Sequence, residues 1–329
     1  MAARSVAAAL SLASGVYAVI VAAHAALFAA GIFRAHRAEA KVVSVGNLTL
    51  GGTGKTPFTA MLARLIREKA GRKPAVLIRG YGRDEQSMLR EQLGDVPLIV
   101  GRDRVAGARE AARERGADVL ILDDGFQHRA LARDLDIVLV DTRDPFGNER
   151  LFPRGILREP VSGIRRAHVV VLTKADRSLV DPGSIRGRLS ALNGGALFLE
   201  AVHAPAYLWD LATRKRMALD TLKGKKTFLV SGIGDPGYFE ATVRGLGAEV
   251  VGHRAFPDHH VYRESDVRLV AEAARAADLA VTTEKDAVKL ESLDSVARSG
   301  LIVAVVHVDM TITHGEGAFI ARLTSVLSR

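Results

Sequence analysis

The residues best suited to chemistry in this chain form a glycine-rich segment, Gly51-Gly52-Thr53-Gly54-Lys55-Thr56. A run of β-branched residues precedes it at 42–45, and a segment compatible with a helix follows it. A strand, a glycine-rich turn and a Lys-Thr pair at a helix start aim backbone N–H groups at phosphate oxygens. In such a loop the lysine reaches the β- and γ-phosphates, and the hydroxyl binds Mg²⁺. The segment therefore predicts a binding site for a nucleoside triphosphate.

This loop departs from the strict phosphate-loop pattern, G-x-x-x-x-G-K-[ST]. Thr49 stands where the first glycine of that pattern belongs. The alternative interpretation is a glycine-rich turn between a strand and a helix, with an incidental lysine. The order of strand, glycine loop and Lys-Thr favours the phosphate site over this alternative.

A pair of carboxylates, Asp123-Asp124, follows the apolar run at residues 119–122. In proteins with a phosphate loop, an acidic residue at such a strand end meets the Mg²⁺ that the loop hydroxyl binds, here Thr56. Adjacent residues of a strand point to opposite sides, so we expect one of the two to face the metal. The pattern does not choose between them, and an acidic pair at a strand-to-turn junction is the alternative.

Two further motifs allow both a chemical and a structural interpretation. Asp258-His259-His260 follows a predicted strand end, where a histidine can orient a base or neutralise transition-state charge. A metal-binding pair and solvated loop histidines are the alternatives. Thr173-Lys174-Ala175-Asp176 resembles the T/N-K-x-D motif that reads guanine, and a structural role is equally open.

Length and composition limit the possible classes of protein. The 329 residues suggest about two domains, and the absence of cysteine excludes disulfides and thiolate metal sites. The net charge of +9 fits nucleic acid, an anionic membrane surface or a phosphorylated substrate as partner. Aromatic residues make up only 5% of the chain, and no basic-aromatic module is present, so nucleic acid is not expected.

The N-terminal segment favours the membrane among these partners. Residues 5–33 contain no Asp, Glu, Lys or Arg, and as a helix they are long enough to cross a hydrocarbon layer of ~30 Å. Arg34, Arg37 and Lys41 follow at once, which places this flank on the cytoplasmic side. A cleaved signal peptide and a buried soluble helix are the alternatives.

Short apolar runs alternate with helical segments along the rest of the chain. This alternation predicts an α/β protein whose parallel sheet is covered on both faces. We expect a membrane anchor helix at residues 1–33, a phosphate-loop (P-loop NTPase-type) domain at 34–202 and a β-ribbon linker at 203–226. A second, smaller α/β domain is expected at residues 227–329.

In their order, these motifs resemble the tetraacyldisaccharide 4′-kinase family, the lipid A kinases of Gram-negative bacteria. The segments that carry the resemblance are VGNLTLGGTGKTP, RGYGR, GDVP, ILDDGFQHRAL, FGNERLFPRGILREP, TKAD, FPDHH and TTEKDAVKL. The chain departs from the family pattern at Ile78, Val96 and Arg154, and the stretch between RGYGR and GDVP is shorter than usual.

The resemblance implies transfer of the γ-phosphoryl group of ATP to the 4′-hydroxyl of tetraacyldisaccharide 1-phosphate, which gives lipid IVA in lipid A biosynthesis. On the nucleotide side, Lys55 would bind phosphate oxygens, and Thr56 with Asp123 and Asp124 would organise Mg²⁺. ATP and Mg²⁺ are therefore the expected cofactors.

On the acceptor side, Asp95 matches the catalytic aspartate of the family, and His259 matches the histidine paired with it. Without the resemblance, Asp95 would be interpreted as an ordinary turn residue. The carboxylate would take the proton of the attacking hydroxyl, and the histidine would fix that carboxylate. Arg158 and Glu159 match a segment near the site, where Arg158 can offset charge on the transferring phosphoryl group.

The expected partners are the acylated disaccharide 1-phosphate and an anionic membrane surface. The resemblance implies a monomer at the cytoplasmic face of the inner membrane. The alternative function is a GTPase-type metallochaperone or a regulatory NTPase, which would use the same loop and would read guanine with TKAD. A nucleotide sensor tethered to the membrane, without catalysis, is a third interpretation.

Overall fold

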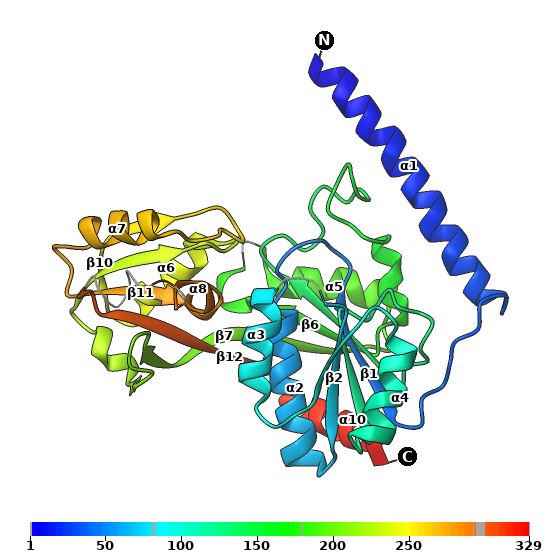
Figure 1. Ribbon diagram of the computed structural model, residues 1–329. Coiled ribbons are helices and arrows are strands. Elements are labelled where there is room, and N and C mark those ends of the chain that lie inside the picture. Colours follow the sequence, from blue (N-terminus) through cyan, green and yellow to red (C-terminus); the bar gives the residue numbers. More distant parts are fainter. Residues whose placement is uncertain (1, 81–82, 179, 292, 294–299, 329) are drawn as a thin grey trace. The chain divides into compact units, whose positions relative to one another are not determined.

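A computed structural model describes residues 2–80, 83–178, 180–291, 293 and 300–328 of the protein (Figure 1). Tyr81 and Gly82 of the RGYGR segment lie outside the described residues. The chain divides into two compact units. Unit 1 comprises Met1–Tyr81, Gln92–Val202 and Met310–Arg329, and unit 2 comprises Gly82–Glu91 and His203–Asp309. The domain limits expected from the sequence stay a prediction.

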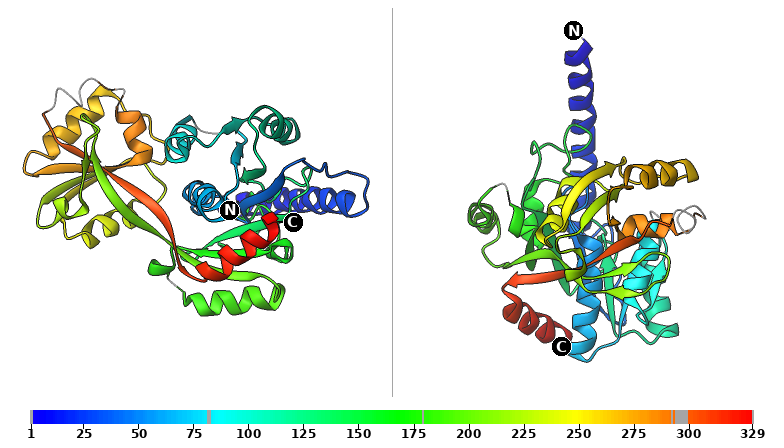
Figure 2. Two further views of the ribbon diagram at one scale, coloured as in Figure 1. Left: turned by 90° about the horizontal axis from the view of Figure 1, so that it is seen from below. Right: turned by 90° about the vertical axis from the view of Figure 1, so that its left-hand side faces the viewer.

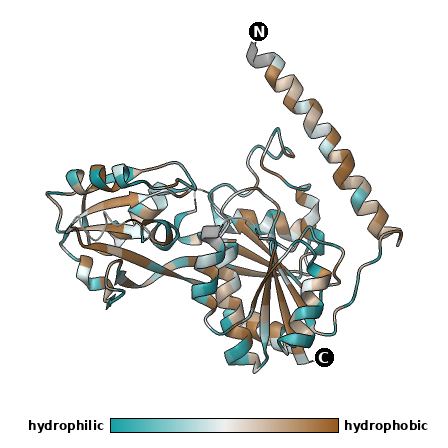
Figure 3. Ribbon diagram, viewed as in Figure 1, coloured by the Kyte–Doolittle hydropathy of each residue, from teal (hydrophilic) through white to brown (hydrophobic). Residues whose placement is uncertain are grey.

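A parallel sheet forms the centre of unit 1. Its strands are β1 (Lys41–Asn47), β2 (Pro74–Ile78), β3 (Leu98–Val100), β4 (Val119–Asp123), β5 (Leu135–Asp141), β6 (Val169–Thr173) and the first part of β7 (Leu197–Asp210). They lie in the order β3-β2-β4-β1-β5-β6-β7, and every pair along this path is parallel. The strands are strongly apolar (Figure 3), as expected of a sheet covered on both faces.

Helices cover this sheet on both faces. They are α2 (Lys55–Ala70), α4 (Arg104–Glu114), α5 (Pro182–Leu192) and α10 (Glu316–Ser328), with the short 3₁₀ helices η1 (Val161–Arg166) and η2 (Ala175–Arg177). One buried cluster joins Val138 and Val170 to Leu189 of α5, and another joins Leu120 to Ala108 of α4.

The N-terminal helix α1 (Ala2–Ala29) is long and straight (Figure 2). Judged by length and composition alone, the segment Ser5–Ala29 of this helix is long enough and apolar enough to cross a membrane. Large apolar side chains of this helix are exposed, among them Leu12 and Val19 at 74% and 68%. Isolated exposed apolar residues are common on proteins, and a long helix with such residues in successive turns is compatible with association with a membrane.

Unit 2 contains its own group of parallel strands and helices. Its elements are α3 (Arg83–Leu93, up to Glu91), β8 (Arg216–Met217), η3 (Leu219–Leu222), β9 (Lys226–Ser231), α6 (Pro236–Gly245), β10 (Glu249–Ala255), α7 (Glu264–Ala273), β11 (Leu279–Thr283), α8 (Glu284–Leu290) and part of β12 (Val303–His314). The strand order is β10-β9-β11-β12, and these pairs are parallel. In β9, Phe228 and Val230 belong to one buried cluster and Leu229 to another, as alternation in a strand requires.

Candidate active site

The glycine loop leads from the carboxyl end of β1 to the first residue of α2. Gly51 and Gly54 have φ values of 111° and 86°, a left-handed region in which glycine is strongly favoured. A Cβ atom at Gly51 or Gly52 would meet no atom within 4 Å, so this side of the loop is open. Because Gly54 at the N-cap has no side chain, the first amide groups of α2 can donate to an anion.

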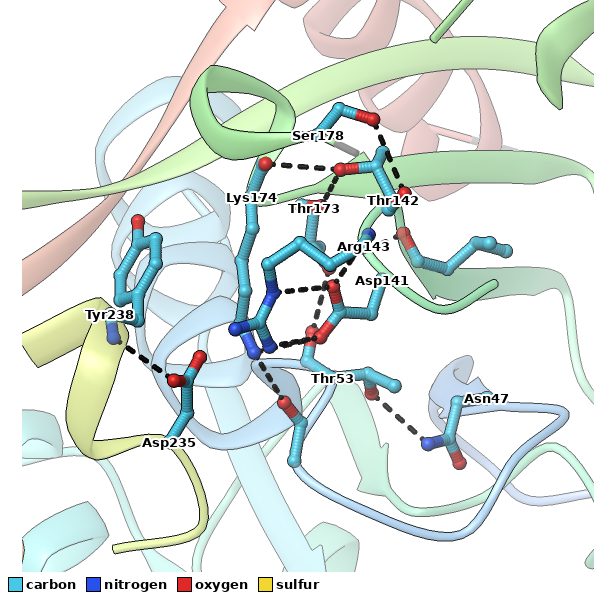
Figure 4. A network of polar contacts seen from close by, with 12 residues as sticks. Asn47, Thr53, Asp141, Thr142, Arg143, Thr173, Lys174, Ser178, Asp235 and Tyr238 are labelled. Atoms are coloured by element: carbon cyan, nitrogen blue, oxygen red, sulfur yellow. Dashed lines mark hydrogen bonds and ion pairs between the residues drawn. The ribbon is translucent and has the colours of Figure 1, made fainter. Parts of the chain in front are cut away.

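Polar side chains from two strand ends hold this loop in place (Figure 4). Asn47 Nδ2 donates to Thr53 Oγ1 at 3.0 Å, and Thr173 Oγ1 donates to the backbone carbonyl of Thr53 at 3.0 Å. All three residues are buried. Buried hydrogen bonds of this kind favour a single arrangement, so these side chains fix the conformation of the loop.

Lys174 of the TKAD motif completes this support. Its Nζ donates to Gly52 O at 3.0 Å and to Asp141 Oδ2 at 2.8 Å (Figure 4), and its exposed fraction is 7%. Burial lowers the pKa of Lys174, while the charge of Asp141 opposes this shift. Two residues of TKAD therefore bind the glycine loop itself. Asp176, the residue that would read guanine, is exposed and lies 3.5 Å from Arg177.

Asp123 lies beside the strand that enters the loop, because β4 pairs with β1 and Asp123 is in register with Val45. Thr59 Oγ1 and the amide of Asp124 both donate to Asp123 Oδ1, at 3.3 and 3.0 Å. Burial raises the pKa of Asp123 to about 6, and the charge of Asp124 adds to the shift while Lys55 opposes it. A carboxylate in this state gains from a nearby cation.

The donor atoms at this edge fit Mg²⁺. Among the residues described, no group of three or more His, Cys, Asp or Glu side chains can hold a metal ion by itself. Mg²⁺ in phosphate sites is commonly bound by one or two carboxylates, a hydroxyl and the phosphates of the substrate. The carboxylate of Asp123 and the hydroxyl of Thr56 at the start of α2, both half-buried residues, supply such oxygens.

Two cationic side chains, Arg158 and Lys55, contact Asp124. The sequence analysis expected both of them to contact phosphate groups. The φ value of Asp124 is 54°, which turns it away from the strand. Arg158 Nη1 donates to both carboxylate oxygens at 2.8 and 2.7 Å, and Lys55 Nζ lies 3.7 Å from Oδ1. Although burial opposes ionisation of Asp124, the charges of Lys55 and Arg158 hold its pKa below the ordinary value. Lys55, Arg158 and the Asp123-Asp124 pair are thus brought together.

Glu159 is a buried residue whose hydrogen bonds stabilise the segments around Asp124 and the glycine loop. It is 4% exposed and accepts hydrogen bonds from Gln127 Nε2 at 2.8 Å and from Arg166 Nη2 at 2.8 and 3.0 Å. Gln127 Nε2 also donates to the carbonyl of Asn47 at 2.8 Å, where the loop begins. Glu159 therefore fixes neighbouring elements of the site.

Arg104 is a residue of this edge that the sequence analysis missed. It is 5% exposed at the start of α4, and its Nη2 donates to the carbonyl of Asp123 at 3.1 Å. Its Nη1 is buried and has no hydrogen-bond partner among the described residues. A buried guanidinium N–H without a partner is costly, so this group is suited to an anionic ligand. In the sequence, Arg104 is marked only as an arginine that follows the apolar run at 98–100, and this pattern does not indicate a ligand-binding residue.

The structure does not bring Asp95 to this edge. Asp95 precedes β3, whereas the glycine loop follows β1. Because β3, β2, β4 and β1 are all parallel, the start of β3 and the end of β1 lie at opposite edges of the sheet. The position of Asp95, exposed in a turn, therefore argues against the catalytic role expected from its GDVP motif.

Asp84 is the carboxylate whose place in the chain fits that role better. It lies in the first turn of α3, six residues after Ile78 ends β2 at the carboxyl edge. It also belongs to unit 2, which contains His259. The feature of the sequence that could have indicated Asp84 is the acidic pair Asp84-Glu85, which follows RGYGR directly in the short stretch before GDVP.

His259 lies in unit 2 at the carboxyl end of β9, where its amide donates to the carbonyl of Gly232 at 3.2 Å. Its φ is 62°, and its side chain is 52% exposed. Lys285 Nζ lies 3.4 Å from His259 Nε2 and donates to Asp258 Oδ1 at 2.9 Å. The imidazole is therefore presented to solvent beside a lysine and a carboxylate.

The parallel sheet, the glycine loop and the adjacent acidic strand end define a nucleotide-binding protein of the P-loop class. A family model described as Tetraacyldisaccharide-1-P 4'-kinase matches residues 6–328. The chain belongs to this family, as the sequence motifs suggested, and the metallochaperone alternative is not favoured.

Named relatives agree with this membership. A tetraacyldisaccharide 4′-kinase of Anaeromyxobacter sp. (strain K) is 40% identical over 97% of this chain and 90% of its own length. One from Syntrophus aciditrophicus is 38% identical over 83% of this chain and 82% of its own length. The crystal structure of an "apo" form of LpxK from Aquifex aeolicus in complex with ATP has a TM-score of 0.75 and 27% identity, covering 98% of this chain and 99% of that one.

Proposed function

We propose that this chain transfers the γ-phosphoryl group of ATP to the 4′-hydroxyl of tetraacyldisaccharide 1-phosphate, giving lipid IVA in lipid A biosynthesis. The observation that carries the proposal is the glycine loop that Asn47, Thr173 and Lys174 hold open beside Asp123. The activity named for the relatives and the ATP in the Aquifex aeolicus structure support it.

On the nucleotide side, the amide groups of the glycine loop (Gly51, Gly52, Thr53 and Gly54) donate to phosphate oxygens. Lys55 moves its ammonium group from Asp124 to the β- and γ-phosphates. Arg104 and Arg158 offset the charge on the transferring phosphoryl group, as fixed cations do in phosphoryl transfer.

Thr56 and Asp123 are the residues that hold Mg²⁺ in this proposal, with Asp124 next to them. When bound, Mg²⁺ neutralises charge on the β- and γ-phosphates and orients them. Asp123 is assigned as the ligand because it is paired with Val45 of β1, which enters the loop, and because burial already disfavours its charged form in the absence of a cation. Asp124 is occupied by Arg158 through both carboxylate oxygens.

On the acceptor side, we assign the general base to Asp84 and no longer to Asp95. The carboxylate takes the proton of the 4′-hydroxyl as the hydroxyl oxygen bonds to the γ-phosphorus, and the bond between that phosphorus and the bridging oxygen breaks so that ADP leaves. His259 belongs to the same unit and is the proposed partner of this base. A base placed in this way contributes about 10²- to 10⁴-fold to the rate.

Helix α1 anchors the enzyme to the bilayer that contains its acylated substrate. Its exposed apolar side chains and the cationic flank at Arg34 and Arg37 fit insertion at the cytoplasmic face of the inner membrane, next to anionic lipids. In this proposal the enzyme acts as a monomer. The residues proposed to bind the nucleotide belong to unit 1.

The test is transfer of radiolabelled γ-phosphate to tetraacyldisaccharide 1-phosphate in mixed micelles, with GTP as a second donor. Wild type is compared with Asp84→Asn and with Asp95→Asn as the matched control. A labelled lipid from wild type and Asp95→Asn, and strong loss in Asp84→Asn, supports the proposal. Hydrolysis without lipid labelling, with GTP preferred, would favour the regulatory NTPase. Loss in Asp95→Asn alone would restore the role of Asp95.

A further inference from the structure

Helix α1 is hydrogen-bonded to one loop of unit 1, residues 151–158, which ends at the arginine that binds Asp124. Ser14 Oγ donates to the carbonyl of Leu151 at 2.8 Å. Tyr17 OH donates to the carbonyl of Arg158 at 2.9 Å. The helix therefore holds both ends of the loop.

The loop also contacts the helix with its own side chains. Arg154 Nη1 donates to the carbonyl of Ala7 at 2.8 Å, and the ring of Phe152 makes an edge contact with that of Tyr17, with centroids 6.0 Å apart. Side chains of both the helix and the loop therefore form this contact.

Two faces of α1 are used differently. Ala7, Ser14 and Tyr17 are half-buried and recur at spacings of seven and three residues, which places them on one face. Leu12 and Val16, which are 74% and 57% exposed, lie on the opposite face. The face that meets the loop is therefore distinct from the apolar face that is open to a bilayer.

The other side of the loop is joined to the chain that enters the glycine loop. The amide of Leu50 donates to the carbonyl of Ile156 at 2.7 Å, and the amide of Arg158 donates to the carbonyl of Leu48 at 2.8 Å. Gly51 follows directly. The backbone of Arg158 is consequently fixed by α1 on one side and by the glycine-loop segment on the other.

We propose that α1 is a positioning element for phosphoryl transfer, in addition to being an anchor, and that Tyr17 is the positioning residue. By binding the carbonyl of Arg158, Tyr17 fixes the place from which that guanidinium reaches the transferring phosphoryl group. The inference rests on the proposed function, because it needs Arg158 to act in the reaction. It commits the apolar face of α1 to a lipid bilayer and the opposite face to the active-site loop.

The experiment compares wild type with Tyr17→Phe, which removes the hydroxyl and keeps the ring beside Phe152. Ser328→Ala is the control for loss of a hydroxyl group, because Ser328 Oγ donates to Thr324 O of its own helix, α10, at 2.8 Å. The expected result is a kcat about two- to tenfold lower in Tyr17→Phe, from the loss of one hydrogen bond. The KM for ATP and the fraction bound to phospholipid vesicles stay unchanged, and Ser328→Ala behaves as wild type.

A double-mutant cycle with Arg158→Ala separates positioning from a general structural effect. If Tyr17 acts through Arg158, Tyr17→Phe lowers kcat in the wild-type background and has no further effect in Arg158→Ala. Equal losses in both backgrounds, or an unchanged kcat in Tyr17→Phe, would overturn the inference while wild type still labels the lipid. Absence of labelled lipid with wild type would instead refute the proposed function.

Discussion

The carboxylate of Asp123 predicts a pH dependence of nucleotide binding that belongs to this side chain. Its pKa is raised to about 6, mainly by burial. With that pKa, about nine-tenths of Asp123 is ionised at pH 7 and about one-tenth at pH 5. If only the ionised carboxylate binds Mg²⁺, affinity for the magnesium complex of a nucleotide falls about tenfold between pH 7 and pH 5.

The assay is isothermal titration calorimetry with Mg²⁺ and a non-hydrolysable ATP analogue at pH 5, 6 and 7. The terminal phosphate of the nucleotide also titrates near pH 6, so Asp123→Asn is titrated in parallel. The ratio of the two affinities then reports Asp123 alone, and it is expected to fall toward one as the pH is lowered. A ratio that does not change with pH would refute the reasoning.

The charge of the neighbouring Asp124 allows a second test, because its effect on the pKa of Asp123 has a known direction. The charge of Asp124 raises the pKa of Asp123, so Asp124→Asn is expected to move the midpoint of the ratio to lower pH. If the pH dependence disappears in Asp124→Asn instead, Asp124 is the carboxylate that binds the metal.

Stability without nucleotide follows from the same shift. A carboxyl group whose pKa is raised by folding stabilises the folded state at low pH, and this contribution is lost as the pH rises through about 6. Asp123→Asn is therefore expected to unfold at a higher temperature than wild type at pH 7, with the difference shrinking toward pH 4. Differential scanning fluorimetry measures the unfolding temperatures of the two proteins at each pH. A lower unfolding temperature of Asp123→Asn than of wild type at pH 7 would contradict the burial argument.

Three further outcomes are expected. Lys55→Ala should abolish lipid phosphorylation and weaken ATP binding, and full activity would remove the loop lysine from the mechanism. Lys174→Met should raise the Kd for ATP about tenfold, because Gly52 O loses its hydrogen bond, while Asp176→Asn should leave the Kd for ATP and GTP unchanged. The reverse pattern would mean that TKAD reads the base. Deletion of residues 1–33 should release the protein from phospholipid vesicles in a flotation assay, and retention would assign membrane binding to another surface.

The parts of the site that sequence analysis could locate are those in which one short segment carries the whole signal. The glycine loop needs only a strand before it and a helix after it, and the Asp123-Asp124 pair needs only an apolar strand. Both patterns are local, and the structure places Lys55, Arg158 and the two aspartates close together, while their roles in the reaction stay a prediction.

Residues whose role depends on strand direction or burial could not be located in this way. Asp95 lies in a good local motif, but the parallel order of β3 and β1 places it at the other edge of the sheet. Arg104 is one of 46 basic residues, and only its burial with an unpartnered Nη1 sets it apart. For Lys174, the contact with Gly52 joins residues far apart in sequence, which no local pattern contains.

The route of the chain through unit 1 has a consequence for biosynthesis on the ribosome. Helix α10 packs on α2, the helix that begins at Lys55, and the buried rings of Phe319 and Phe58 lie 6.3 Å apart. The glycine-loop helix therefore lacks part of its apolar cover until residues 310–328 have been translated. Unit 2 is synthesised before that moment, and its residues 203–309 leave the ribosome first. Nascent chains are thus expected to expose the apolar side of α2 during translation of unit 2, which makes this face a recognition site for chaperones.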